Sequence, residues 1–223
     1  MAVTPVSHAD GRVEGMVALT TDYVLRSVSR SDGSPALQAD VHFQGQSGWL
    51  AGAWISSVDV NQEDGGTVEL SAYFGLSRPV AVGWSVTLLA AHYAYPRNTP
   101  DGLYAYDELT AGVAYRDLVF VTLAVSPNTP YESSPGLASD RTAVSYEVAL
   151  QHPLAGAWSA HGGLGYYDLR GAEAYTYWNA GVSYDFSPWR VEMAWFGAAP
   201  DTPAIVNEDT TRSHWAATLT WRF

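Results

Sequence analysis

Apolar and polar side chains alternate one by one along most of this chain. Residues 67–76 show the pattern most clearly, because their even positions are all apolar and their odd positions carry Thr67, Glu69, Ser71, Tyr73 and Gly75. A period of two places the two classes on opposite faces of an extended strand. Twelve segments of about ten residues repeat it, each bounded by Gly, Pro, Asp, Asn or Ser. They are 16–27, 35–44, 48–58, 67–77, 80–93, 104–115, 118–126, 142–151, 157–167, 175–185, 189–197 and 214–223.

No segment has the spacing of an amphipathic helix. The charge-free run 79–96 has the length of a membrane helix, but Gly83, Ser85, Thr87 and His92 interrupt it in alternating register. The chain is therefore predicted to be all-β, and two architectures remain open. A soluble sandwich would turn its polar face to water, whereas a membrane barrel would turn its apolar face to lipid.

The lengths of the connections favour the barrel. Short connections at 44–48, 77–80, 116–117, 152–156 and 186–188 alternate with longer ones, which reach a dozen residues or more at 128–141 and 198–213. Strict alternation sends short and long connections to opposite rims. Outer-membrane barrels have this arrangement, with tight periplasmic turns and longer extracellular loops.

Aromatic residues gather at the ends of the segments, as in the interfacial girdles of membrane barrels. Those near short connections are Trp49, Trp84, Tyr115, Trp158, Tyr184, Trp189 and Phe223. Those near long connections are Tyr23, Tyr93, Tyr104, Tyr175, Trp195 and Trp215. Ten residues at about 3.3 Å each, tilted by about 40°, reach roughly 25 Å, which matches the apolar band of such barrels.

The last segment alternates Trp215, Ala217, Leu219 and Trp221 and ends on Phe223, which resembles the terminal signal read by the barrel-assembly machinery. The sequence thus predicts a twelve-stranded antiparallel transmembrane β-barrel over residues 15–223, after an N-terminal arm at 1–14. The expected location is the outer membrane of a Gram-negative bacterium, as an integral protein in contact with its lipid.

Composition narrows the function. Charged residues make up 15% of the chain, below the roughly 25% of an average soluble domain. The net charge is −12, which opposes binding to nucleic acid, and there is no cysteine for disulfides, thiolate metal sites or thiol catalysis. The first fifteen residues lack the basic and apolar regions of a signal peptide, so an exported chain would be a mature form.

The first predicted hairpin carries a recognisable set of residues, which are Leu19, Thr20, Thr21, Asp22, Tyr23, Arg26, Ser29, Ser31, Pro35, Ala36 and Gln38. In these residues it resembles the TorF-type porin family of proteobacterial outer-membrane proteins. It continues through Gly48, Gly52, Trp54, Ser56, Val58, Val68, Glu69, Leu70, Tyr73, Gly75, Tyr93, Tyr95, Pro96, Tyr106 and Glu108, and is looser after Tyr115. Ser27 stands where the family carries Gly, and Leu25 where an aromatic is commoner. The resemblance implies an outer-membrane location and a role in solute passage.

The polar faces of the segments predict the lining of a pore. The expected pore-lining residues are Asp22, Arg26, Gln38, Asp40, His42, Glu69, Tyr73, Glu108, Glu147, Gln151, Arg190, Glu192 and Arg222. Six of them are acids and three are arginines, which leaves an excess of negative charge. Charged groups in the lumen of a membrane barrel form ion pairs or are hydrated, so these residues imply either a salt-bridged interior or a water-filled path. The predicted function is a porin-like passive channel for small polar solutes, favouring cations or zwitterions over anions.

Twelve strands lie between barrels that their own side chains fill and barrels with wide pores. Small inward residues predict space beside several strands, namely Gly83, Ser85, Thr87, Gly112, Ala114, Gly163, Gly165, Gly181 and Ser183. An alternative is that this space accommodates an inserted loop or the arm. The competing function is a closed structural or adhesive barrel that acts through its extracellular loops.

Enzymatic and metal sites are not expected. Barrel phospholipases carry a Ser ten residues after a His, but the positions ten after His42, His92, His152 and His161 are all Gly. The zinc motif HExxH, the GxSxG elbow and a phosphate loop are missing. The acids of the long connections do not form the twelve-residue EF-hand pattern of a calcium site. No cofactor is predicted.

Overall fold

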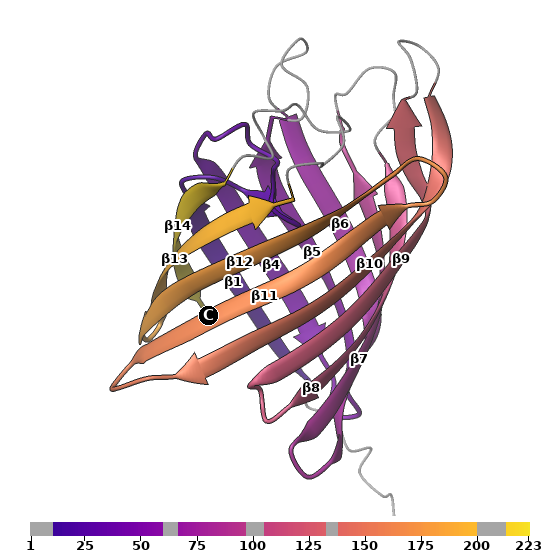
Figure 1. Ribbon diagram of the computed structural model, residues 1–223. Helices are drawn as coiled ribbons and strands as arrows, with labels where there is room; N and C mark the ends of the chain where they lie inside the picture. The colour runs from indigo at the N-terminus through magenta and orange to yellow at the C-terminus, as the bar shows by residue number, and fades with distance from the viewer. Residues whose placement is uncertain (1–10, 60–66, 97–104, 133–137, 200–212) are drawn as a thin grey trace, which may run out of the picture.

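The computed structural model describes residues 11–59, 67–96, 105–132, 138–199 and 213–223, and twelve of its strands form a closed barrel (Figure 1). These strands are β1 (Arg12–Thr20), β4 (Ala36–Gln44), β5 (Trp49–Val58), β6 (Thr67–Ala81), β7 (Trp84–Ala94), β8 (Tyr106–Tyr115), β9 (Val119–Glu132), β10 (Ala138–Pro153), β11 (Trp158–Leu169), β12 (Glu173–Phe186), β13 (Trp189–Ala198) and β14 (His214–Arg222). A separate pair, β2 (Val24–Leu25) and β3 (Val28–Ser29), lies in the first connection. The predicted all-β barrel with twelve antiparallel strands is confirmed.

Sequential strands pair in order, and β1 closes the barrel against β14. Met16 is the register partner of Arg222, and Thr20 is the partner of Thr218. Gly15 and Phe223 complete the seam by exchanging backbone hydrogen bonds of 2.9 and 3.0 Å. Closure of the barrel pairs the backbone N–H and C=O groups of the two edge strands. In an open sheet these groups would lie unpaired in hydrocarbon, which costs several kcal/mol for each group.

The apolar face of every strand points away from the barrel axis. Phe74, Leu88 and Leu150 are each more than half exposed, whereas the side chains of Ser56 and Glu69 on the inner face are 0% exposed. This is the reverse of a soluble sandwich, whose apolar faces would be covered. The outer face therefore contacts lipid, and the alternative of a soluble sandwich is excluded.

The short turns and both described ends of the barrel, Arg12 and Phe223, lie at one rim (Figure 1). The turn between β4 and β5 needs Gly48, which has a φ of 91° and whose added Cβ would lie 2.6 Å from the carbonyl oxygen of Ser77. Gly83, expected on the inner face, lies instead in the turn before β7. β1 begins at Arg12, so residues 12–14 of the expected arm pair with β4. Residues 1–10 of that arm lie outside the described residues.

Three connections at the other rim differ from the sequence expectation. The first strand ends at Thr20, because the chain leaves the wall there. The long connection expected at 128–141 is mostly strand, since β9 and β10 continue past the rim as a paired ribbon (Figure 1). The Arg141 guanidinium packs over the Tyr131 ring at 4.8 Å and stabilises this extension. Only 170–172 connect β11 to β12. Most of the expected connection 198–213 lies outside the described residues.

The two predicted aromatic girdles have different outcomes. At the short-turn rim the rings face outward, as shown by Trp84 against Tyr115 at 4.8 Å and Trp158 against Tyr184 at 5.0 Å between centroids. At the other rim Trp215 is 60% exposed, but Tyr175 is 8% exposed and turns into the barrel. Tyr23 and Tyr93 also turn inward and pack on buried side chains, and Tyr104 lies outside the described residues. These inward rings surround the first connection.

Candidate functional site

Most of the predicted pore-lining residues lie on the inner face of a barrel strand. Register settles this, because side chains paired across neighbouring strands share a face. One inward row runs through Gln38, Ser56 and Glu69, and another passes from Glu147 to Gly165 and Tyr177. The strand residues that face inward are Gln38, Asp40, His42, Glu69, Tyr73, Glu108, Glu147, Gln151, Arg190, Glu192 and Arg222.

Asp22 and Arg26 reach the lumen differently from the prediction. They were expected on the first strand, but both belong to the connection between β1 and β4, residues 21–35. This connection, here called the plug, folds into the barrel instead of standing above it. Its contacts with inward side chains and backbone on β6, β8, β12 and β14 show that it crosses the lumen. The alternative of an inserted loop is therefore what the structure has.

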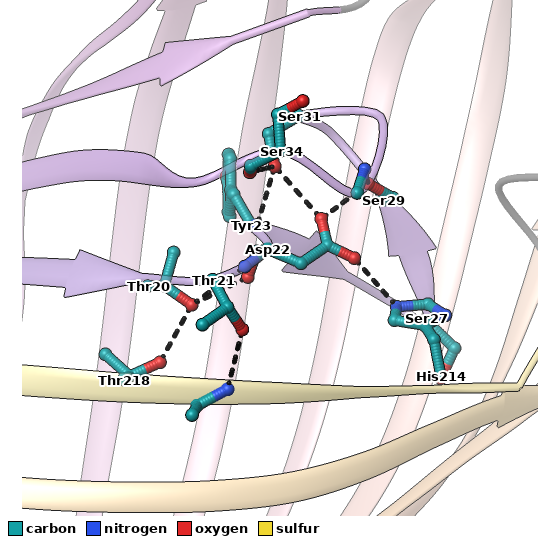
Figure 2. A network of polar contacts seen from close by, with 12 residues as sticks. Thr20, Thr21, Asp22, Tyr23, Ser27, Ser29, Ser31, Ser34, His214 and Thr218 are labelled. Carbon is teal, nitrogen blue, oxygen red and sulfur yellow. Dashed lines mark hydrogen bonds and ion pairs between the residues drawn. The ribbon is translucent and has the colours of Figure 1, made fainter.

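The base of the plug is held by the buried carboxylate of Asp22 (Figure 2). The hydroxyls of Ser29 and Ser31 donate to its Oδ1 at 2.6 and 3.0 Å. Nε2 of His214, on β14, lies 3.2 Å from its Oδ2. Ser29 in turn accepts from the backbone N–H of Gly33 at 3.0 Å. One carboxylate thus ties both arms of the plug to the closing strand.

Three threonines fix the point where the chain leaves the wall (Figure 2). The Thr20 hydroxyl donates to the carbonyl of Asp22 at 2.7 Å, and it lies 3.0 Å from the Thr218 hydroxyl of β14. The Thr21 hydroxyl accepts from the backbone N–H of Ala217 at 3.0 Å. The plug therefore starts from a fixed position on β1 and β14.

The tip of the plug docks on the far wall. The Arg26 guanidinium donates to Oε2 of Glu108 at 2.6 Å and lies 5.3 Å from the ring centre of Tyr167. The neighbouring Ser27 hydroxyl donates to the carbonyl of Trp178 at 3.0 Å. Charge-assisted hydrogen bonds of this kind are about twice as strong as neutral ones. The tip is thus bound to β8, β11 and β12.

The turn at the tip is strained. Arg26 and Ser27 have φ values of 53° and 60°, between the paired residues Leu25 and Val28. Two residues of positive φ in a two-residue hairpin favour Asn-Gly, and other residues cost on the order of 1 kcal/mol or more each. Arg26 keeps the conformation because the wall holds it, in part through a 3.3 Å bond from the Tyr175 hydroxyl to its carbonyl.

A third anchor lies on β6, where Glu69 is fully buried. The hydroxyls of Tyr23 and Tyr95 donate to its two oxygens at 3.1 and 2.5 Å. Burial raises the pKa of the Tyr23 hydroxyl well above its usual value, and the charge of Glu69 raises it further. Both phenols therefore remain donors at neutral pH. Nearby, the carbonyl of Arg30 accepts from the backbone N–H of Asp59 at 2.8 Å.

The half of the lumen nearer the short turns carries a strip of opposite charges. Arg190 donates to the Ser183 hydroxyl at 2.8 Å and to Glu192 at 3.4 Å. Its other nitrogen lies 3.7 Å from Asp185, which also lies 3.6 Å from Arg222. This strip therefore runs across β12, β13 and β14 with its charges paired.

The strip continues onto β1 and β4. Arg12 lies 2.9 Å from Glu14, whose second oxygen is 3.5 Å from His42. His42 also contacts Asp40 at 2.7 Å, and the Tyr73 hydroxyl donates to Asp40 at 2.6 Å. Among the described residues, the Asp40 carboxylate has no arginine within 4.0 Å. The described polar partners of this carboxylate are therefore the His42 ring and the Tyr73 hydroxyl.

Some of the space expected beside small residues is used by neighbouring side chains. A Cβ on Gly165 would lie 2.1 Å from the Tyr177 ring, and one on Gly181 would lie 2.5 Å from His161. Gly112 differs, because its nearest neighbours would be 3.8 Å away. Gly165 and Gly181 thus leave room for the neighbouring Tyr177 and His161 side chains, whereas a Cβ at Gly112 on β8 would meet its neighbours at ordinary contact distance.

Several inward residues were not predicted. Glu14, Asp185 and His214 have the correct alternation for the inner face, so register would have found them. Tyr177 on β12 follows the same alternation, whereas Arg30 could not be assigned in this way, because it lies in the plug. Among the residues described, no group of three or more His, Asp or Glu side chains forms a metal site. No described helix is long and apolar enough to cross a membrane.

The fold is shared with outer-membrane channels of unrelated sequence. The chain superposes on the KdgM porin with a TM-score of 0.57 and 8% identity, covering 95% of this chain and 98% of that one. It superposes on the NanC porin with the same score and 8% identity, covering 94% and 98%. For an outer membrane channel from Pseudomonas putida F1 the score is 0.57 at 11% identity, covering 99% of both chains.

A closed barrel with an apolar exterior and a polar interior is an integral membrane protein. The fold that it shares with porins agrees with the outer membrane as its location. No curated protein sequence matches the chain. The model of the Gcw_chp family matches residues 6–223, and the chain therefore belongs to this family of bacterial proteins of unknown function.

Proposed function

We propose that this protein is a porin-like passive channel of the outer membrane for small polar solutes, and that it favours cations or zwitterions. The observation that carries the proposal is the polar lumen of a barrel whose exterior is apolar. A charged lumen is not required for the stability of the folded barrel, because buried charges cost free energy unless they are paired or hydrated. The channel fold of the neighbours supports the same reading.

The preference for cations follows from the balance of charge along the path. The inner wall carries more carboxylates than guanidinium groups; the Tyr177 hydroxyl donates to Glu147, and Asp40 is bonded to the Tyr73 hydroxyl and to the His42 ring. A focused negative field in a narrow lumen raises the local concentration of cations. We assign the route to the residues predicted from sequence as pore-lining, with Arg26 and Asp22 on the plug.

Three further proposals accompany this function. The barrel-assembly machinery would read β14, whose last ring, Phe223, is 55% exposed beside Trp221. The TorF-type assignment would make the chain one of a group of porins, based on the residues of the first hairpin. The protein would act without a cofactor and without bond-breaking chemistry; in support, charged groups described on the inner face are engaged in ion pairs, as in Arg26 with Glu108 and Arg190 with Glu192.

A second candidate function is the closed structural or adhesive barrel. The observation in its favour is the plug, which contacts β6, β8, β12 and β14 and so crosses the lumen. In this case the protein would act through the rim that carries β9 and β10. The two functions differ in one measurable property, which is ion conduction.

The test is a planar-bilayer recording of the purified protein under a salt gradient, together with liposome swelling. We expect unitary currents and a reversal potential on the cation-selective side. Asp40→Asn with Glu147→Gln should move that potential towards zero. Asp107→Asn is the matched control, because Asp107 is on β8 but faces outward beside His92.

Two outcomes would contradict the proposal. Anion selectivity would contradict the proposed preference for cations but would still show that the protein is a channel. Absence of current and of swelling, both in the native chain and in a chain without the plug, would favour the closed barrel.

A further inference from the structure

The tip of the plug places a guanidinium group inside a cage made by the barrel wall. Arg26 lies between the carboxylate of Glu108, at 2.6 Å, and the ring face of Tyr167, at 5.3 Å. Proteins commonly bind organic cations between a carboxylate and the face of an aromatic ring. The carboxylate attracts the cation by its charge, and the ring attracts it by the negative potential of its face. The wall part of this cage is built from strands β8 and β11 and does not depend on the plug.

The cage is buried and preorganised. The side chains of Arg26 and Glu108 are only 17% and 11% exposed. The guanidinium belongs to a residue of the turn at the tip of the plug, and both central residues of this turn, Arg26 and Ser27, have positive φ. That turn is strained, so the docked plug is held by its wall contacts against its local backbone preference.

We propose that Glu108 and Tyr167 form a binding site for solutes with a guanidinium or ammonium group, and that Arg26 occupies this site as a built-in competitor. Binding of such a solute excludes Arg26 and favours the undocked plug. A ligand shifts an equilibrium by its difference in affinity for the two states, and here that difference arises because only the undocked state offers the site. The proposal names the solute class of the channel and rests on the proposed function only for the passage of that solute.

The chain lacks cysteine, so one engineered thiol can report on docking. Ser27 is 2% exposed beside the carbonyl of Trp178, and Ser27→Cys changes little more than one atom. A membrane-impermeant maleimide should label this thiol slowly while the plug is docked. Labelling in proteoliposomes requires no ion flow, so the result is independent of whether the barrel conducts.

Guanidinium chloride is the probe, compared with sodium chloride at equal ionic strength and at millimolar concentration. In the Ser27→Cys chain we expect guanidinium to raise the labelling rate, because it competes with Arg26. Adding Arg26→Ala should raise the basal rate by about tenfold or more, the factor that corresponds to loss of a charge-assisted hydrogen bond. In that variant guanidinium should no longer raise the rate, because the site is then open in both states of the plug and the ligand has no difference in affinity through which to act.

Glu108→Gln should remove the response of the Ser27→Cys chain to guanidinium, and Asp107→Asn should keep it, since Asp107 is the preceding residue on the outer face. Tyr167→Leu should weaken the response, whereas Tyr166→Leu, on the outward face and 43% exposed, should not. A guanidinium effect of the same size with and without Arg26, or one that survives Glu108→Gln, would overturn the proposed site. A barrel that never conducts but shows a response that depends on Arg26 and Glu108 would remove the channel function and leave the site in place.

Discussion

At the scale of single residues, the lumen depends on glycines that make room for large polar side chains. Gly165 is the clearest case, because Tyr177 lies across it and reaches Glu147 at 2.9 Å and Ser145 at 3.1 Å. Tyr177 is only 2% exposed. Gly165 therefore positions the Glu147 carboxylate indirectly, because it leaves the room that Tyr177 needs to reach this carboxylate.

Gly165→Ala should displace the Tyr177 ring, since an added Cβ would lie 2.1 Å from it. Overpacking of this kind costs about 1–3 kcal/mol. We expect a lower urea midpoint for unfolding in detergent, monitored by tryptophan fluorescence. Gly112→Ala is the control, because its nearest neighbours at 3.8 Å leave ordinary contact distance. Equal losses in the two variants would show that crowding is not the cause.

The phenols on Glu69 predict a loss of stability at alkaline pH. Burial raises the pKa of Tyr23 and of Tyr95 above the ordinary value, in both cases with a contribution from Glu69. The unfolded chain then loses these protons first, so their contribution is complete below about pH 10 and falls above it, by at most about 1.4 kcal/mol per pH unit for each phenol. Urea unfolding across this range should show a steeper decline for the native chain than for Tyr23→Phe with Tyr95→Phe. Parallel curves would contradict the assignment.

At the scale of elements, the plug is an insertion into a hairpin that is otherwise complete. Thr20 and Ala36 are register partners at the ends of β1 and β4. A two-residue turn would join them directly. The plug extends the barrel ladder at its first residue, where the Thr21 N–H donates to the carbonyl of Ala217 at 2.9 Å, and its contacts with Glu69, Glu108 and His214 lie in the lumen.

Replacing residues 21–35 by Asn-Gly should leave the barrel closed and raise its unitary conductance severalfold. Glu69→Gln and Glu108→Gln belong in the same variant, because a buried carboxylate without its partner costs several kcal/mol. The measurement is a bilayer recording beside the native chain, with circular dichroism as the control for folding. A folded variant with unchanged conductance would show that the plug does not limit the path.

At the scale of the whole molecule, the alternation of apolar and polar side chains along each strand determines both the lipid-facing exterior and the polar lumen. Val148 and Ala149 illustrate it on β10. Val148 is 47% exposed on the outer face, and Ala149 faces inward between Gly163 and Phe120. Neighbouring residues of similar size therefore lie in lipid and in the lumen.

This predicts opposite results for the same substitution at adjacent positions. Val148→Arg should destabilise the barrel by about 2–4 kcal/mol if it lies near the membrane centre. Ala149→Arg should fold, but lower conductance and weaken cation selectivity, because it adds positive charge to the lumen. Refolding yield into liposomes and bilayer recordings separate the two. Equal tolerance of both variants would contradict the assignment of faces.

Alternation was sufficient to predict the strands and the inner face from sequence. Asp40, Glu147 and Glu192 needed only their register, since each strand lies between two partners that fix it. The plug could not be predicted in this way. Its residues continue the polar and apolar rhythm of β1, and only the distant partners Glu108, Trp178 and His214 draw them out of the wall. Long-range ion pairs leave no local periodicity.

The outward aromatic rings are distributed unevenly, and this sets how the barrel sits in the bilayer. Among the described strands, outward rings such as Trp49, Trp84, Trp158 and Trp189 lie at the short-turn rim, whereas at the other rim Trp215 is outward but Tyr93 and Tyr175 turn inward. Amphipathic rings fix depth at a headgroup layer. The short-turn rim is therefore expected to fix the height of the barrel at one headgroup layer, and the opposite end, with fewer outward rings, to be held less tightly.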